Sequence, residues 1–328
     1  MLFAKPRLLL ATSLIILGLG SAHAVATMQA ESVAKGLVEA LVAKLNQSGW
    51  QVQVGEINAS PYDRSVDIEN IRILDQQGRA HSIDAITLKN IELNAERDFI
   101  QSMHVETRDA VVTLIKLTEQ SNKFNELHSY LQALGINSGR IGHRQLLALD
   151  YDKKSAQLFV SMEGQLHHPA DNRAMPLVDF HWQSRFSKVP DLKQQLLMLG
   201  NPENRAALAI PWTNLSLISG ELSIQDQGAW EPLMRSAAEQ NNMPEAAFRQ
   251  KLKQDWQNAV NEWRLLPDPL KLQATQAVGS AVDSSQPAML LNVDATNQQG
   301  NSIAMAMMTT MISPMVLTQL FDITLEAE

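Results

Sequence analysis

The sequence predicts an α+β protein with an N-terminal helix, a curved antiparallel β-sheet meander with helices packed on one side, and a mostly helical C-terminal third. Three observations predict this class. Apolar and polar residues alternate with a period of two over residues 50–116. One amphipathic phrase occurs twice within that stretch, twenty residues apart. In the last third, the apolar residues mostly recur at the spacing of helices.

The first 24 residues have the features of an export signal. Lys5 and Arg7 form a positive start, an apolar run follows over residues 8–20, and Ala22-His23-Ala24 has the A-x-A form of a processing site. Two fates are open. The segment is either a signal peptide cleaved near Ala24 or an anchor in the inner membrane.

Anchoring would use residues 8–28, because no charge recurs until Glu31. The apolar run itself is short for a membrane span, which takes about 20 residues. In both cases the positive end stays inside, so the remainder of the chain is expected in the periplasm. We therefore divide the chain into residues 1–24 (signal peptide or anchor), 25–225 (helix plus amphipathic sheet) and 226–328 (helical segment with closing strands).

Residues 29–47 are predicted to form the N-terminal helix. Apolar residues fall at helical spacing: Ala34, Leu37, Val38, Leu41, Val42 and Leu45. We expect this helix to pack on the core. A juxtamembrane stalk, or a lid on the sheet that follows, is the alternative.

The repeated phrase predicts two strands of one meander. Ile68-x-Asn70-Ile71-x-Ile73 returns as Leu88-x-Asn90-Ile91-x-Leu93, and a turn at residues 75–78 joins them. Since the apolar residues flanking each asparagine are three apart, a bulge at Asn70 and at Asn90 would restore one apolar face and bend the sheet. The candidate apolar sheet face is Ile68, Ile71, Ile73, Leu88, Ile91 and Leu93.

The remaining elements follow from the same two periods. Strands are expected over residues 111–115, 145–151, 155–162, 177–186, 213–225, 289–293 and 321–325. Helices are expected over residues 121–134, 192–199, 230–239, from Met243 to the break at Pro267, and over 270–282. The segment 303–320 is apolar and interrupted by Pro314.

The export segment, the helix and the strands of "VDIENIRILDQQGRAHSIDAITLKNIEL" resemble the repeating strand pattern of AsmA-like bacterial envelope proteins. The motifs "GELSIQDQG" (220–228), "MPEAAFR" (243–249) and "LFDITLEAE" (320–328) are similar to the C-terminal portion of uncharacterised exported proteins of that broad group. The resemblance implies a curved sheet with an apolar inner face that handles lipid or supports outer-membrane assembly. It implies no individual site residue.

Composition excludes several classes of function. The net charge is −8, so there is no basic footprint for nucleic acid. The chain has no cysteine, which excludes disulfides, thiolate metal sites and a cysteine nucleophile. The sequence contains no nucleophile elbow, P-loop, HExxH or dinucleotide fingerprint. We expect neither enzymatic activity nor a cofactor.

Three short motifs have a functional and a structural interpretation. His167-His168-Pro169-Ala170-Asp171 is either half of a metal site or a solvated loop, and the loop is favoured. Residues 294–300 faintly resemble a calcium loop, but Met305 stands where the glutamate is required, so a hairpin turn is favoured. Asp226 is expected to cap a helix rather than to act as a catalytic acid.

Methionine is concentrated near the C-terminus. Thioethers bind Cu(I), fill apolar cores, or form adaptable apolar surfaces for lipid or peptide. The five residues are Met305, Met307, Met308, Met311 and Met315. Met308, Met311 and Met315 share a helix face and are the candidate adaptable apolar surface.

Together these observations favour a non-enzymatic periplasmic or envelope protein that binds lipid or assists envelope assembly through a curved amphipathic sheet. Its expected partners are acyl chains and other envelope proteins. The alternative is a structural or protein-interaction module of the envelope without lipid cargo.

Overall fold

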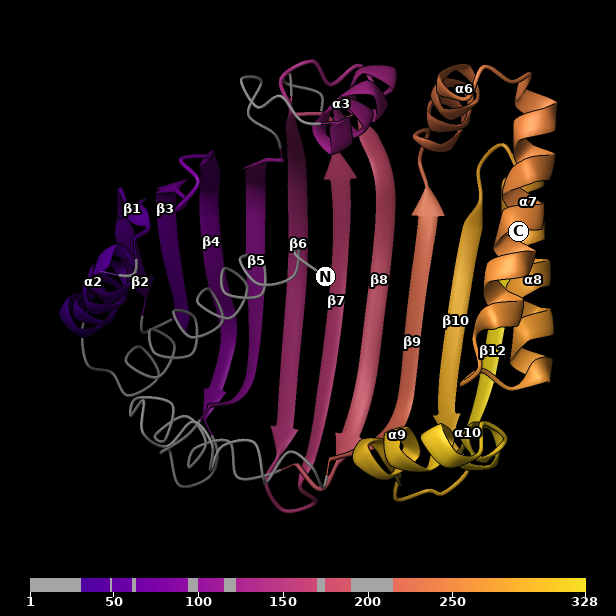
Figure 1. The fold of residues 1–328 in the computed structure, drawn as a ribbon. Helices are drawn as coiled ribbons and strands as arrows, with labels where there is room; N and C mark the ends of the chain where they lie inside the picture. The colour runs from indigo at the N-terminus through magenta and orange to yellow at the C-terminus, as the bar shows by residue number, and fades with distance from the viewer. Residues whose placement is uncertain are drawn as a thin grey trace. The chain divides into compact units, whose positions relative to one another are not determined.

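The computed structural model describes residues 31–47, 49–60, 63–93, 100–114, 122–169, 175–189 and 215–328 (Figure 1). The chain forms two compact units. The N-terminal unit comprises residues 1–119 and 138–150, and the C-terminal unit comprises residues 120–137 and 151–328. The predicted export segment and the predicted helix over residues 192–199 lie outside the described residues.

The described residues of the N-terminal unit form an antiparallel meander with one helix. Strands β3 (Ser65–Leu74), β4 (Ala80–Leu93), β5 (Ile100–Thr113) and β6 (Arg140–Asp152) pair in chain order. Two short strands, β1 (Gln51–Gln53) and β2 (Ile57–Ser60), both pair with the outer edge of β3. Helix α2 (Glu31–Gln47) packs on β1 and β2, and its Val38 is 1% exposed.

Both repeated asparagines adopt left-handed backbone, with φ of 54° at Asn70 and 55° at Asn90. At Asn90 the pairing of β4 with β5 shifts by one residue, so the predicted bulge is present there. At Asn70 the pairing of β3 with β4 keeps its register, so the prediction of a bulge in that ladder is wrong. The left-handed conformation of Asn70 reverses the alternation of side chains along β3. Ile68 and Ile71 are three residues apart, yet both are therefore buried.

One face of this meander is a closed core. A row of directly paired apolar residues crosses it: Val66, Leu88, Val105 and Leu147, which are 0, 0, 7 and 8% exposed. The alternation of β-strands places every second side chain on this side. Strand β5 begins at Ile100, whereas the sequence predicted a strand only from residue 111. Most of residues 101–109 are polar, but Met103 and Val105 alternate with them and are both buried.

The C-terminal unit contains five long antiparallel strands. They are β7 (Gln157–His167), β8 (Pro176–Ser187), β9 (Ser216–Asp226), β10 (Ala288–Ala295) and β12 (Phe321–Ala327), paired in that order. The two-residue strand β11 (Asn301–Ser302) pairs with the start of β9. The turn before β11 has Gly300 at a φ of 81°, as expected for a hairpin-type turn.

In this unit, helices lie at both ends of the strands and beside β12 (Figure 1). Helices α6 (Trp230–Gln240), α7 (Glu245–Glu262) and α8 (Asp268–Asp283) pack on one another in order, and α3 (Asn122–Ala133) packs on α6. Helix α8 lies along β12, where Gln273 Oε1 accepts a hydrogen bond from the Leu325 N–H at 3.2 Å. Helices α9 (Ile303–Ile312) and α10 (Val316–Leu320) lie at the opposite end of the strands from α6.

The α+β class with antiparallel pairing is confirmed, and the described residues form seven helices and twelve strands. The domain boundary predicted at residue 225 stays a prediction. Strands β8 and β9, which the sequence assigned to the first region, pair with β7 and β10 in the C-terminal unit. Strand β10 is the second neighbour of β9, although 61 residues that include three helices separate the two strands in the chain.

Candidate functional site

The C-terminal sheet has one apolar face. Its central row consists of Met162, Trp182, Leu222, Leu291 and Leu325, which are directly paired across the five strands. A second row contains Gly164, Phe180, Ile224, Met289 and Ala327, and a third contains Val160, Ser184, Gly220, Val293 and Ile323. We call these three rows the apolar face. The Phe180 ring lies across Gly164, since a Cβ there would be 2.1 Å from its Cζ atom.

The opposite face of the same sheet is polar and internally bonded. Gln165 Nε2 donates to Asp179 Oδ1 at 2.8 Å, and Gln183 Nε2 donates to Glu221 Oε2 at 3.2 Å. His181 lies between two carboxylates, 3.7 Å from Glu163 and 3.9 Å from Glu221. These cross-strand pairs stabilise the sheet and leave its apolar side chains on the other face.

The apolar face is incompletely covered. All five side chains of its central row are half-buried, and Ile224 in the next row is 43% exposed. The equivalent row of the N-terminal sheet is at most 8% exposed. Among the described helices, α8 packs on β12 and reaches β10, and α10 packs on β12; no described helix packs extensively on β7, β8 or β9. This difference makes the apolar face the strongest candidate binding surface in the described part of the chain.

A second apolar surface lies on α9 and the residues after it. Met308, Met311 and Met315, the predicted adaptable surface, are 69, 71 and 51% exposed. Met305 and Met307 are 58 and 66% exposed. Ser302 caps the helix by accepting the Met305 N–H at 3.3 Å, so the exposed side chains stand on a helix with a defined start. We call these five residues the methionine surface.

The predicted apolar sheet face of the N-terminal unit is buried. Ile68, Ile71, Ile73, Leu88 and Ile91 are at most 6% exposed. The side chain of Leu93 lies outside the described part of the chain. The geometry of these five residues is therefore that of a packed core.

One titratable cluster lies at the end of the N-terminal sheet. The buried Asp75 carboxylate accepts hydrogen bonds from the Gln77 and Arg79 N–H groups at 2.9 and 2.8 Å and from Arg79 Nε at 2.7 Å. Burial acts to raise the pKa of Asp75, but the hydrogen bonds and the charge of Arg79 outweigh it, so its pKa is below the ordinary value. The cluster closes the β3–β4 turn.

His81 completes that cluster. Its Nε2 atom is 3.4 Å from Asp75 Oδ2, and its Nδ1 atom accepts the Thr113 N–H at 3.3 Å. Burial lowers the pKa of His81, the positive charges of Arg79 and Arg140 act in the same direction, and Asp75 opposes them. A neutral ring that donates to Asp75 and accepts from Thr113 fits both contacts. The pair therefore stabilises the turn.

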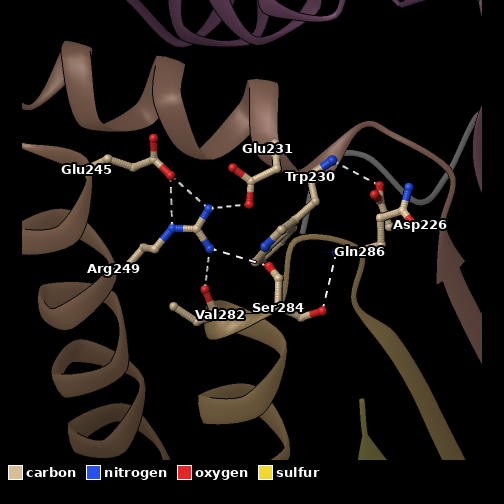
Figure 2. A network of polar contacts seen from close by, with 8 residues as sticks. All are labelled: Asp226, Trp230, Glu231, Glu245, Arg249, Val282, Ser284 and Gln286. Carbon is tan, nitrogen blue, oxygen red and sulfur yellow. Dashed lines mark hydrogen bonds and ion pairs between the residues drawn. The ribbon is translucent and has the colours of Figure 1, made fainter.

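An ionic network joins three helices of the C-terminal unit (Figure 2). Arg249 of α7 donates to Glu245 on its own helix at 2.8 and 3.0 Å, and to Glu231 of α6 at 2.6 Å. It also donates to the carbonyls of Val282 and Ser284 at the end of α8. Its hydrogen bonds are directed to these protein groups, so we interpret Arg249 as a structural clamp.

Asp226 binds the backbone at the start of α6, as expected of a capping residue, although Ala229 directly precedes the helix. Its carboxylate accepts the N–H groups of Gly228 and Ala229 at 3.0 and 2.9 Å, and that of Trp230, the first helical residue, at 2.9 Å. Figure 2 shows the contact with Trp230. Three backbone donors at a helix start are the usual partners of a capping aspartate. The bonding of Asp226 is therefore that of a cap.

The metal interpretations gain no support. Within the described residues, no group of three or more histidine or acidic side chains could hold a metal ion. His168 Nε2 is 2.9 Å from the Gly135 carbonyl, and Asp171 lies outside the description. In residues 294–300, Asn297 Oδ1 accepts the Gln299 N–H at 3.0 Å and the Asn297 carbonyl accepts the Gly300 N–H, as in a tight turn.

The strands of the apolar face carry a signal in the amino-acid sequence. Phe180-x-Trp182, Leu222-x-Ile224 and Leu291-x-Val293 each alternate with polar residues. The alternation predicts amphipathic strands, but only the register shows that these pairs form continuous rows.

Comparison with known proteins adds one partial match. Residues 183–328 match a protein-family model whose description reads "Uncharacterized protein". No curated protein matches the chain. The matched segment contains β9, β10, β12 and all the helices from α6 onward, which is most of the unit that carries the apolar face. None of the described helices combines the length and apolar character needed to span a membrane.

Proposed function

We propose that this protein is a non-enzymatic envelope protein that binds the acyl chains of lipid on the apolar face of its C-terminal sheet. The observation that carries the proposal is the half-buried central row, Met162, Trp182, Leu222, Leu291 and Leu325. The N-terminal signal features support export, and the AsmA-like resemblance supports a lipid-handling role.

The dimensions and chemistry of the row suit an acyl chain. Strands are about 4.8 Å apart, so a row across five strands is about 19 Å long. One leaflet of a bilayer is about 15 Å deep in hydrocarbon, which is the length of one ordered acyl chain. An acyl chain has no hydrogen-bonding groups, and the row has none in its side chains except the Trp182 indole. Each methylene that the row removes from water would contribute about 0.8 kcal/mol.

Paired substitutions on the two faces test the proposal. Leu222→Gln combined with Leu291→Gln places amides in the middle of the central row. Ser223→Gln combined with Asn292→Gln alters the same two strands on the polar face. The measurement is the affinity of the purified protein for a fluorescent sixteen-carbon fatty acid, with displacement by palmitate.

We expect the apolar-face variant to bind at least about tenfold more weakly, since two or three methylene contacts are worth that factor. The polar-face variant should bind within about twofold of the wild-type protein, because it leaves the apolar rows intact. Equal binding by both variants would place the acyl site elsewhere. Absence of binding by the wild-type protein would reject the proposal.

The methionine surface favours a second candidate, an interaction module that binds another envelope protein. Unbranched thioether side chains adapt to different apolar partners. Replacing Met308 and Met311 with glutamine should abolish capture of a protein partner by this surface and leave acyl binding unchanged. Loss of acyl binding in that variant would instead make the methionine surface part of the lipid site.

A further inference from the structure

A small pocket lies at one end of the N-terminal sheet, apart from the apolar face. Its volume is about 260 Å³. It lies where β3 ends and β4 and β6 begin, and its polar lining comes from Gln51, Gln53, Arg72, Ser82, His81 and Arg140. This volume is just below the range of about 300–1,000 Å³ that is typical of drug-sized ligands, so the pocket suits a small group.

Strand register explains why these side chains meet. Gln53 pairs with Arg72, and Arg72 pairs with Ser82, so the three lie in one row across β1, β3 and β4. Arg140 pairs with Thr113, whose hydroxyl donates to the Ala80 carbonyl of β4. Alternation places this row on the face opposite the buried Ile73. The pocket is therefore a feature of the outer face of the sheet.

The lining has hydrogen-bond donors and positive charge but no carboxylate. Two guanidinium groups, two amides and a hydroxyl are all able to donate. Within the described residues, neither Arg72 nor Arg140 forms an ion pair, whereas Arg79, Arg144 and Arg249 each do. Asp75, the acid of the neighbouring turn, is bonded to Arg79.

Arg140 provides the most specific observation. Its Nε atom is buried and has no hydrogen-bond partner in the described structure. A buried charged donor without an acceptor is unfavourable, because the loss of water is not compensated. Arg72 is exposed, so water hydrates its guanidinium group, whereas Arg140 is half-buried and an anion in the pocket would compensate its charge.

We propose that this pocket binds a phosphate-type oxyanion through Arg72 and Arg140, with Gln51, Gln53 and Ser82 as further donors. Guanidinium groups bind tetrahedral oxyanions through paired, charge-assisted hydrogen bonds. The oxyanion is either inorganic phosphate or the headgroup phosphate of a phospholipid. The inference does not depend on the acyl site, because the two surfaces belong to different compact units.

The test uses the full protein and two probes. Inorganic phosphate is titrated into the protein in a calorimeter. In parallel, sedimentation is measured with phosphatidylcholine vesicles that contain or lack phosphatidylglycerol. The pocket variants are Arg72→Gln, Arg140→Gln and their combination. The matched control is Arg144→Gln, four residues further along β6, where Arg144 is exposed and paired with Asp109 at 2.6 Å.

We expect phosphate or the anionic vesicles to bind the wild-type protein, with about a tenfold loss for each guanidinium removed. Arg144→Gln should bind like the wild-type protein. Binding of phosphate alone identifies the free ion, and binding confined to phosphatidylglycerol vesicles identifies the headgroup; both support the pocket. Thermal unfolding without ligand checks that the variants are folded.

Two results would overturn the inference. One is the absence of binding to both probes. The other is an equal loss in Arg144→Gln, which would show attraction by general surface charge. An acyl-site variant such as Leu222→Gln with Leu291→Gln should keep its phosphate binding, so failure of one proposal is distinguishable from failure of the other.

Discussion

At the scale of single residues, the two repeated asparagines share an unusual backbone conformation. Asn70 and Asn90 have φ of 54° and 55°, a region that asparagine and glycine tolerate and β-branched residues do not. We predict that Asn70→Gly changes the free energy of unfolding by less than about 0.5 kcal/mol, whereas Asn70→Val lowers it by about 1–2 kcal/mol. Urea denaturation of the two variants measures the difference. Equal stabilities would show that the left-handed conformation is unimportant.

His81 makes stability depend on pH. Its folded pKa lies below the ordinary value of 6.5 because the ring is buried. Between these two values the unfolded chain binds a proton that the folded protein does not, so stability falls as the pH is lowered from 6.5. Asp75, with a pKa below its ordinary 3.8, continues the loss at lower pH.

We predict that the wild-type protein loses more stability than His81→Gln when the pH is lowered from 7.5 to 5.5. Glutamine has no proton to gain in this range, so the variant lacks the contribution of His81. Urea midpoints at the two pH values give the comparison. Parallel losses in the two proteins would mean that His81 is not held neutral by the fold.

Residue-scale prediction from the sequence succeeded where the partners are local. Asp226 was identified as a cap because its donors lie two to four residues away. Arg249 was not singled out, since its partners Glu231 and Val282 are 18 and 33 residues distant. The same applies to the pocket, where Arg72 and Arg140 come together only through the pairing of the strands.

At the scale of elements, Arg249 connects three helices. We predict that Arg249→Met lowers the free energy of unfolding by about 2 kcal/mol, allowing for the partial solvent access of its two glutamates. Lys251→Met on the same helix breaks only an exposed pair with Asp255 and should cost less than about 0.5 kcal/mol. Chemical denaturation distinguishes them. Similar costs would show that the network is not a clamp.

The β3–β4 pair depends on its buried face. Ile71 and Ile91 are 4 and 0% exposed, so Ile71→Asp or Ile91→Asp would bury a charge and should cost at least about 3 kcal/mol. Gln101→Asp, at an exposed site in β5, is the control. Circular dichroism during heating provides the measurement. A wild-type melting curve for either isoleucine variant would contradict the register.

Element prediction was good for strongly periodic segments and poor for polar ones. The repeated phrase, residues 177–186 and residues 321–325 were assigned as strands because β-branched, aromatic and aliphatic residues alternate there. Most of β5 was missed, since residues 100–110 contain several charged residues that face outward. Neighbouring strands on both sides, not local preference, make that segment a strand.

At the scale of the whole molecule, the two units use antiparallel sheets differently. The N-terminal sheet buries its apolar rows almost completely, whereas the C-terminal sheet leaves its central row half-buried. The sequence predicted an amphipathic sheet and left open whether helices fill its apolar face, and the residues of the repeated phrase that the structure describes form a packed core. Alternation alone does not show which apolar face is covered. That depends on where helices such as α8 pack.

The most direct test of the acyl-binding proposal is native mass spectrometry of the protein purified gently from whole cells with their membranes, followed by organic extraction. The proposal predicts a bound lipid at a defined stoichiometry, and its loss in the Leu222→Gln and Leu291→Gln double variant. A ligand-free mass for the wild-type protein, with no acyl lipid in the extract, would contradict the proposal and favour the interaction module.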